Sequence, residues 1–119
     1  MEKKNISYAL KIYEGLIENQ PDVKRKGKRL PYTSLKGNMF SFISKDGHIG
    51  LRFSEEDVEK YMALYGFTEF IQNDRVMVDY VQIPDEFLEN KLLVDLFNEC
   101  CQYAKTIEPR PKTKNRDKQ

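Results

Sequence analysis

Residues 39–66 are MFSFISKDGHIGLRFSEEDVEKYMALYG, and this stretch holds the clearest structural signals in the chain. Two segments rich in Phe, Ile and Leu flank Asp46-Gly47, the dipeptide that favours a two-residue hairpin turn because both positions need a positive φ. This turn predicts that Ser44 pairs with Ile49, Phe42 with Leu51 and Phe40 with Phe53. Paired residues share one face of a hairpin, so these six predict a face that packs on a core.

A helix is predicted directly after this hairpin, over residues 54–66. Ser54 is a suitable N-cap, because its hydroxyl can accept a hydrogen bond from a backbone N–H of the first turn. The first turn is acidic, which favours the helix dipole. Apolar side chains then recur at helical spacing, and Gly66 is suited to a left-handed C-terminal cap.

The remaining elements are two more helices and a second pair of strands. Residues 5–19 and 84–107 have helical periodicity, with Pro84 in the first turn of the second helix. Residues 67–83 favour two strands that turn at Asn73-Asp74. Residues 20–38 predict a loop with a short extra strand near 29–36.

The order predicts an α+β fold: a two-layer sandwich of an antiparallel sheet and helices, in the order α-β-β-α-β-β-α. The chain has 119 residues, which suits one domain, predicted over residues 1–108. Residues 109–119 contain no apolar side chain and are predicted to form a disordered basic tail.

Positive charge is concentrated in two places, although the net charge is only +1. From residue 105 onward there are six basic and two acidic residues, or +4, which leaves 14 basic and 17 acidic residues, or −3, for the rest. Lys and Arg clusters neutralise phosphates, so a candidate nucleic-acid surface follows. Its residues are Lys24, Arg25, Lys26, Lys28, Arg29, Arg110, Lys112, Lys114 and Arg116.

Cys100 and Cys101 are adjacent, a spacing that rarely forms a disulfide. No secretory signal opens the chain, and no apolar run approaches the 18 or more residues that cross a membrane. We therefore expect a protein of a reducing compartment, the cytoplasm, with no membrane association. At least one of the two cysteines is predicted to fill the core, as an alternative to metal binding.

The residues with chemical potential each have a simpler structural explanation. His48 can serve catalysis, but it is predicted to be an exposed turn residue without an orienting partner. The acidic group at 55–59 can bind metal, but its spacing is not that of a calcium loop. Asp79 lies in a segment of strand formers and is predicted to face solvent, an edge or a partner. No phosphate-loop motif occurs, and Gly50 is predicted opposite Ile43 at a close approach or bulge.

A family resemblance covers about residues 36–111. The stretch GNMFSFISKDGHIGLRFSEEDVEKYMALYG, followed by RVMVDYVQIPDEFLEN, resembles the TfoX N-terminal domain family. That family has an aromatic strand, an Asp-Gly turn, an I-G-L-R-L/F-S return strand, a helix ending in Y-G and a V-M-x-D/E-Y-V-x-I/V-P strand. The layout is also similar to that of YjbR-type domains. The matching positions are Phe40, Phe42, Gly47, Gly50, Leu51, Tyr80 and Pro84, all structural in kind.

The resemblance implies a regulatory role, because the named family member activates competence genes. It implies no catalytic residue, cofactor or metal. The first functional hypothesis is therefore a non-enzymatic regulatory or protein-interaction module, as a monomer or a homodimer. The alternative is a weak, non-specific nucleic-acid binder that uses the two basic segments. An exposed apolar patch would favour the first hypothesis.

Overall fold

The computed structural model describes residues 2–108, and side chains from residue 7 onward. Its helices are α1 (Glu2–Glu18), α2 (Glu55–Tyr65) and α3 (Leu92–Thr106), with one 3-10 turn, η1 (Asp85–Phe87). Its strands are β1 (Tyr32–Leu35), β2 (Asn38–Ile43), β3 (Ile49–Arg52), β4 (Thr68–Gln72) and β5 (Arg75–Ile83). The predicted disorder of 109–119 concerns residues outside the described range.

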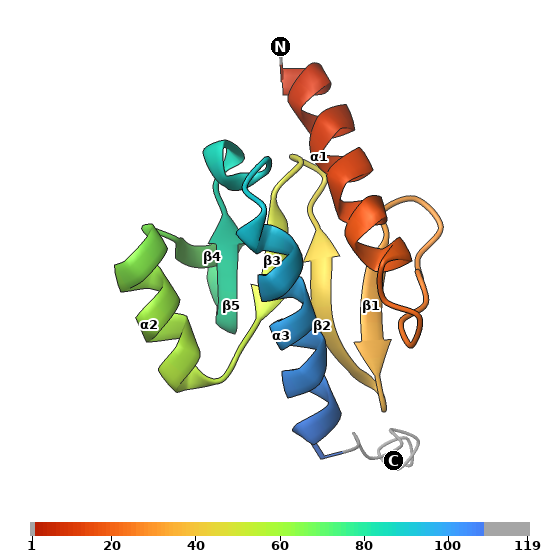
Figure 1. Ribbon diagram of the computed structural model, residues 1–119. Coiled ribbons are helices and arrows are strands. Elements are labelled where there is room, and N and C mark those ends of the chain that lie inside the picture. Colours follow the sequence, from red (N-terminus) through yellow and green to blue (C-terminus); the bar gives the residue numbers. More distant parts are fainter. Residues whose placement is uncertain (1, 109–119) are drawn as a thin grey trace, which may run out of the picture.

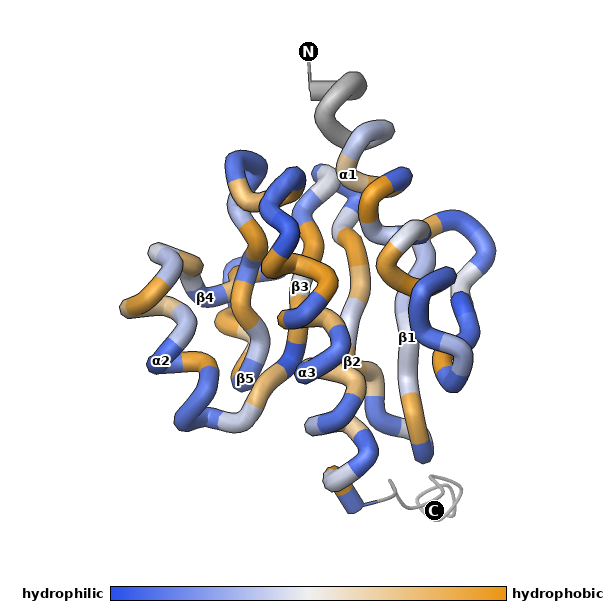
Figure 2. Tube along the Cα trace, viewed as in Figure 1, coloured by the Kyte–Doolittle hydropathy of each residue, from blue (hydrophilic) through white to orange (hydrophobic). Residues whose placement is uncertain are grey.

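The strands form one antiparallel sheet in the order β1-β2-β3-β5-β4. Figure 1 shows α1 and α3 packed on one face of this sheet, with α2 beside β4 and β5. The predicted α+β class is therefore confirmed. Figure 2 shows hydrophobic segments concentrated where α3 crosses β2 and β3, while the loop between α1 and β1 is mostly hydrophilic.

The short strand predicted near 29–36 is present as β1, so the sheet has five strands. β1 joins β2 through Lys36-Gly37, and β4 joins β5 through the predicted Asn73-Asp74 turn. All four turn residues have positive φ, from 54° to 83°. Positive φ at both central positions is the geometry of a tight two-residue hairpin turn, and its twist matches that of the strands.

The first predicted hairpin exists, but its predicted register is wrong by one residue. Phe42 pairs with Gly50, not with Leu51, and Ile43 pairs with Ile49. The turn contains three residues, because Ser44 N donates to His48 O at 2.9 Å and only Gly47 has a positive φ. In such a three-residue loop a single residue adopts the left-handed conformation, so Asp46 does not need to.

A bulge in β2 compensates for this shift. Thr33 pairs with Ser41 and Ser34 pairs with Met39, so Phe40 is the extra residue. A bulge can turn two consecutive side chains toward the same face. Phe40 packs near Phe97 of α3, with ring centroids 6.4 Å apart, and its neighbour Ser41 contacts α1. Phe40 therefore stays on the helix-covered face, as predicted.

Phe42 does not lie on that face, contrary to prediction. It forms a second, smaller cluster with Phe70 and Tyr80, whose ring centroids lie 4.7 and 5.4 Å from its own. Gly50 lies beneath these rings and opposite Phe42, not opposite Ile43. The expected close approach at Gly50 is real, but the approaching groups are aromatic side chains.

The helix predicted over 84–107 is divided into two parts. Asp85–Phe87 form the η1 turn, and α3 begins only at Leu92. The Asn90 carboxamide oxygen accepts a hydrogen bond from Leu92 N at 2.8 Å, which is the local capping chemistry that ends or starts a helix. Phe87 and Leu88 before this break and Leu93 after it all belong to the main core.

The α2 helix agrees with its prediction at both ends. Ser54 Oγ accepts from Asp57 N, and Gly66 adopts the left-handed conformation with φ 75°. Its acidic first turn contains Glu55, Glu56 and Asp57 as expected. These signals lie within one turn of the helix, so no distant residue is needed to fix them.

Two glycine-to-alanine substitutions should change stability in opposite directions. A Cβ on Gly50 would lie 2.6 Å from a ring carbon of Phe42 and 3.0 Å from one of Phe70, so Gly50→Ala should cost about 1–3 kcal/mol through overpacking. Gly15→Ala should stabilise by about 1 kcal/mol, because its Cβ in α1 meets nothing within 4 Å. Urea unfolding measures the free energy of unfolding of both variants. The same change in this free energy for both variants would contradict the packing at Gly50.

Candidate nucleic-acid loop and acidic groove

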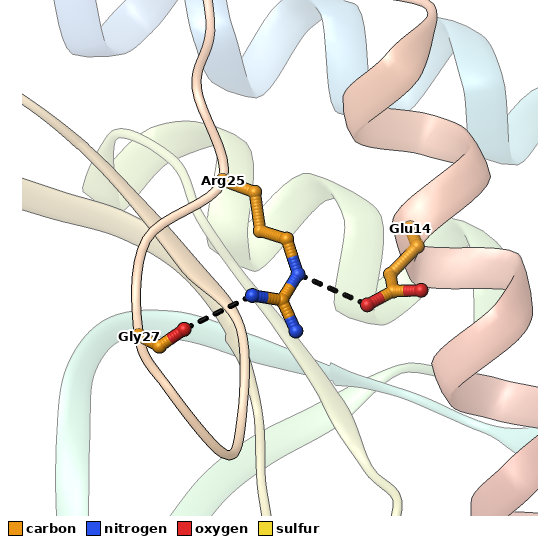
Figure 3. A network of polar contacts seen from close by, with 3 residues as sticks. All are labelled: Glu14, Arg25 and Gly27. Carbon is orange, nitrogen blue, oxygen red and sulfur yellow. Dashed lines mark hydrogen bonds and ion pairs between the residues drawn. The ribbon is translucent and has the colours of Figure 1, made fainter.

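The basic segment 24–29 lies in the exposed loop between α1 and β1. Figure 3 shows how Arg25 anchors it: Nε pairs with Glu14 of α1 at 3.0 Å, and a terminal nitrogen donates to the Gly27 carbonyl at 3.0 Å. Gly27 has φ +91°, and a Cβ there would lie 2.3 Å from the Leu30 carbonyl oxygen. The loop therefore has a defined shape that requires glycine at this position.

The structure divides the five predicted cations of this loop into two groups. Arg25 bonds to Glu14, and Lys26 Nζ donates to Ser34 Oγ at 2.8 Å. Within the described residues, Lys24, Lys28 and Arg29 form no ion pair or side-chain hydrogen bond. These three are available to a ligand. The other predicted cations, Arg110, Lys112, Lys114 and Arg116, lie outside the described residues.

The end of α3 lies beside this loop. Lys105 Nζ pairs with Asp22 Oδ2 at 3.4 Å, just before the basic segment. Asn38 Nδ2 also donates to the Glu108 carbonyl at 2.8 Å. Glu108, the last described residue, therefore lies at the β1–β2 side of the sheet, the side that carries the basic loop.

Two buried groups of polar side chains have structural explanations. Ser41 Oγ lies 2.6 Å from Tyr13 Oη and 2.5 Å from Thr33 Oγ1, so the three buried hydroxyls satisfy one another. Cys100 Sγ donates to the carbonyl of Phe40, the bulge residue, at 3.1 Å. Burial raises the pKa of Tyr13 and of Cys100, so both keep their protons. The predicted core role of the cysteines is confirmed, since both are buried and free.

His48 is half-buried, which corrects the prediction of an exposed turn residue. The ring lines a pocket of about 250 Å³ with Ser44, Gln72 and Gln82, and Nδ1 is buried without a hydrogen-bond partner among the described residues. Small-molecule pockets usually enclose roughly 300–1,000 Å³. This pocket lies below that range, so we do not assign it a ligand.

A larger groove of about 780 Å³ lies between α2, β5 and the end of α3. Its hydrophobic lining includes Val58 and Met62 of α2 and two exposed β5 side chains, Val76 (49% exposed) and Val78 (74% exposed). The charged residues that line it are all acidic: Glu55, Glu59, Glu69 and Asp79. We call it the acidic groove.

Asp79 shapes the acidic groove through its backbone. It has φ 71°, and residues 78–80 have no partner in β4, because Glu69 pairs with Val81 while Phe70 already pairs with Met77. The Asp79 carbonyl instead accepts from Phe53 N at 2.9 Å. Asp79 was predicted to face solvent, an edge or a partner. In the structure it lies at a bulge of β5, half-buried, and lines the groove.

Sequence reasoning did not find the acidic groove. Its residues come from four elements, α2, β4, β5 and α3, and no sequence motif spans them. The one available signal was an acidic residue inside a segment of strand formers, at Asp79.

No known protein family, curated protein or solved structure matches this chain. Among the side chains that the structure describes, residues 7–108, no three His, Cys, Asp or Glu converge to hold a metal ion. None of the helices in this part of the chain is both long and apolar enough to cross a membrane.

The cysteines should resist reaction with thiol reagents in the folded protein. Burial raises the pKa of Cys101 to about 11, while the Lys105 charge opposes this shift. Because the thiolate is the reactive form, about one Cys101 in a thousand is reactive at pH 8. A thiol-specific disulfide reagent at pH 8 should react slowly with the native chain and rapidly with both cysteines in urea. Rapid reaction in the native state would contradict the burial.

Proposed function

We propose that this protein is a non-enzymatic interaction module with a regulatory role of the TfoX kind. The carrying observation is the acidic groove, which exposes Val76 and Val78 beside four carboxylates. Exposed apolar side chains with a polar rim are typical of protein-binding surfaces. The partner that fits is a protein segment with apolar and cationic side chains, because both parts of the groove then find complementary groups.

Two tyrosines with raised pKa values have structural roles that explain these shifts without catalysis. Burial is the main cause of the raised pKa values of Tyr13 and Tyr80, and each hydroxyl is hydrogen-bonded to another group of the protein. Catalytic sites usually gather such groups around one pocket with a shared geometry. Here they serve the bulge region: Tyr80 Oη donates to the Met39 carbonyl at 2.7 Å, next to Phe40.

Val78→Lys should weaken partner binding at least about tenfold, because it removes exposed apolar surface and adds a repulsive cation. The matched control is Leu92→Lys, which changes an exposed residue of α3 outside the groove. Both sites are exposed, so stability should change by only about 0.5 kcal/mol.

Affinity capture with the wild type and both variants should identify proteins retained by the wild type and Leu92→Lys but lost with Val78→Lys. The Kd of such a protein, once purified, then measures the effect. The proposal fails if every captured protein binds Val78→Lys as tightly as the wild type.

A second candidate function is weak, non-specific nucleic-acid binding. The observation that favours it is the position of Lys24, Lys28 and Arg29 on an exposed loop beside the end of α3, the helix that precedes the basic residues 109–119 in sequence. This loop and the basic segment that follows α3 can then contact neighbouring phosphates of one backbone.

Fluorescence anisotropy with a labelled random DNA duplex across salt concentrations tests this function. The slope of log binding constant against log salt concentration should become less steep by about 0.9 for each phosphate contact removed. The variants that test this are Lys24→Gln, Lys28→Gln and Arg29→Gln. Arg25→Gln is a less suitable change, because it also breaks the ion pair with Glu14. Absence of binding at low salt would eliminate this candidate.

A further inference from the structure

The acidic groove lacks a cationic partner within the described structure. Glu55, Glu59, Glu69 and Asp79 form no ion pair with the side chains of residues 7–108, and no Lys, Arg or His of this range lines the groove. The carboxylates do not converge on a metal site in this part of the chain. They line the groove together with exposed apolar side chains such as Val76 and Val78, so the ligand that fits is an extended chain with several cations.

Such a segment occurs in this chain. Residues 109–119 are PRPKTKNRDKQ, and cations occupy every second position: Arg110, Lys112, Lys114, Arg116 and Lys118. In an extended chain, alternate side chains lie on the same face about 6.6 Å apart. We propose that residues 109–119 bind the acidic groove of the same molecule in an extended conformation.

The connection is long enough for this contact. Tyr103 lines the groove and lies five residues before Glu108, so the two Cα atoms are at most about 18 Å apart. The eleven residues that follow Glu108 can span about 36 Å when extended. The segment can therefore cross from the β1–β2 side of the sheet to α2.

The chemistry of the segment suits both parts of the groove. Lys and Arg place their charges beside carboxylates while their aliphatic stems cover apolar surface such as Val76 and Val78. Each exposed ion pair is weak, but the attachment to α3 gives the segment an effective concentration in the millimolar range. An intrinsic Kd near 1 mM is then enough to fill about half of the grooves.

The bound segment would regulate both proposed binding activities. It would cover the surface proposed for a protein partner and withdraw its cations from phosphates. This inference rests on the proposed function only because both involve the acidic groove. A measurement on the groove itself, with no partner or DNA present, tests whether residues 109–119 bind there independently of whether a partner protein does.

NMR spectra of the ¹⁵N-labelled full chain provide this readout. The test variant is Lys112→Glu/Lys114→Glu/Arg116→Glu, whose changes lie outside the described fold. Relative to the wild type, this variant should change the amide chemical shifts of groove residues such as Val58, Met62, Val78 and Tyr103. Adding about 1 M NaCl, where the Debye length is about 3 Å, should remove this difference.

Substitutions in the groove give a matched pair. Glu59→Gln/Glu69→Gln should release the segment, while Glu56→Gln should not, because Glu56 lies on the same helix but outside the groove. Combining Glu59→Lys/Glu69→Lys with Lys112→Glu/Lys114→Glu should restore the contact through reversed charges. Thermal unfolding of each variant reports whether its fold is retained.

Three results would overturn the proposal. One is identical groove amides in the wild type and the tail variant at low salt. Another is a change confined to the loop at 24–29. A third is a shift that disappears on roughly tenfold dilution, because an intramolecular contact is independent of protein concentration.

Discussion

The bulge at Phe40 determines how the two faces of the sheet are used. One extra residue in β2 lets Phe40 face α3 and Ser41 face α1, while Phe42 turns to the opposite face. The carbonyl of Phe40 accepts from Cys100 Sγ, and the neighbouring Met39 carbonyl accepts from Tyr80 Oη, so side chains satisfy the two carbonyls at or beside the irregularity. Buried backbone groups seldom remain without partners, which explains why a thiol and a phenol lie at these positions.

A second bulge, at residues 78–80 of β5, creates the surface that we associate with function. Its left-handed residue Asp79 interrupts the pairing with β4 and leaves Val78 exposed next to α2. Bulges often occur beside functional sites because they redirect side chains without ending the strand. The two bulges therefore have different consequences: the first completes the core and the second opens the acidic groove.

The charge distribution separates two sides of the molecule. The exposed loop at 24–29 is basic and lies near the end of α3, while the acidic groove lies between α2 and β5. This separation suits different ligands, since phosphates are repelled from the groove and cationic segments from the loop. The residues at turn and core positions specify architecture rather than a ligand. The proposals for function consequently depend on surfaces and their charges.

The sequence by itself determined the elements whose signals are local. The capped α2 helix, the Asn73-Asp74 turn, the short strand at β1 and the core role predicted for at least one cysteine all agree with the structure, because each depends on residues within a few positions or on a strong hydrophobic preference. Tertiary structure alone decided the register of the first hairpin, the break before α3 and the acidic groove. The physical reason is that a register is chosen by packing on both faces at once, and in the observed register Gly50 lies opposite Phe42 and leaves room for the rings of Phe42 and Phe70.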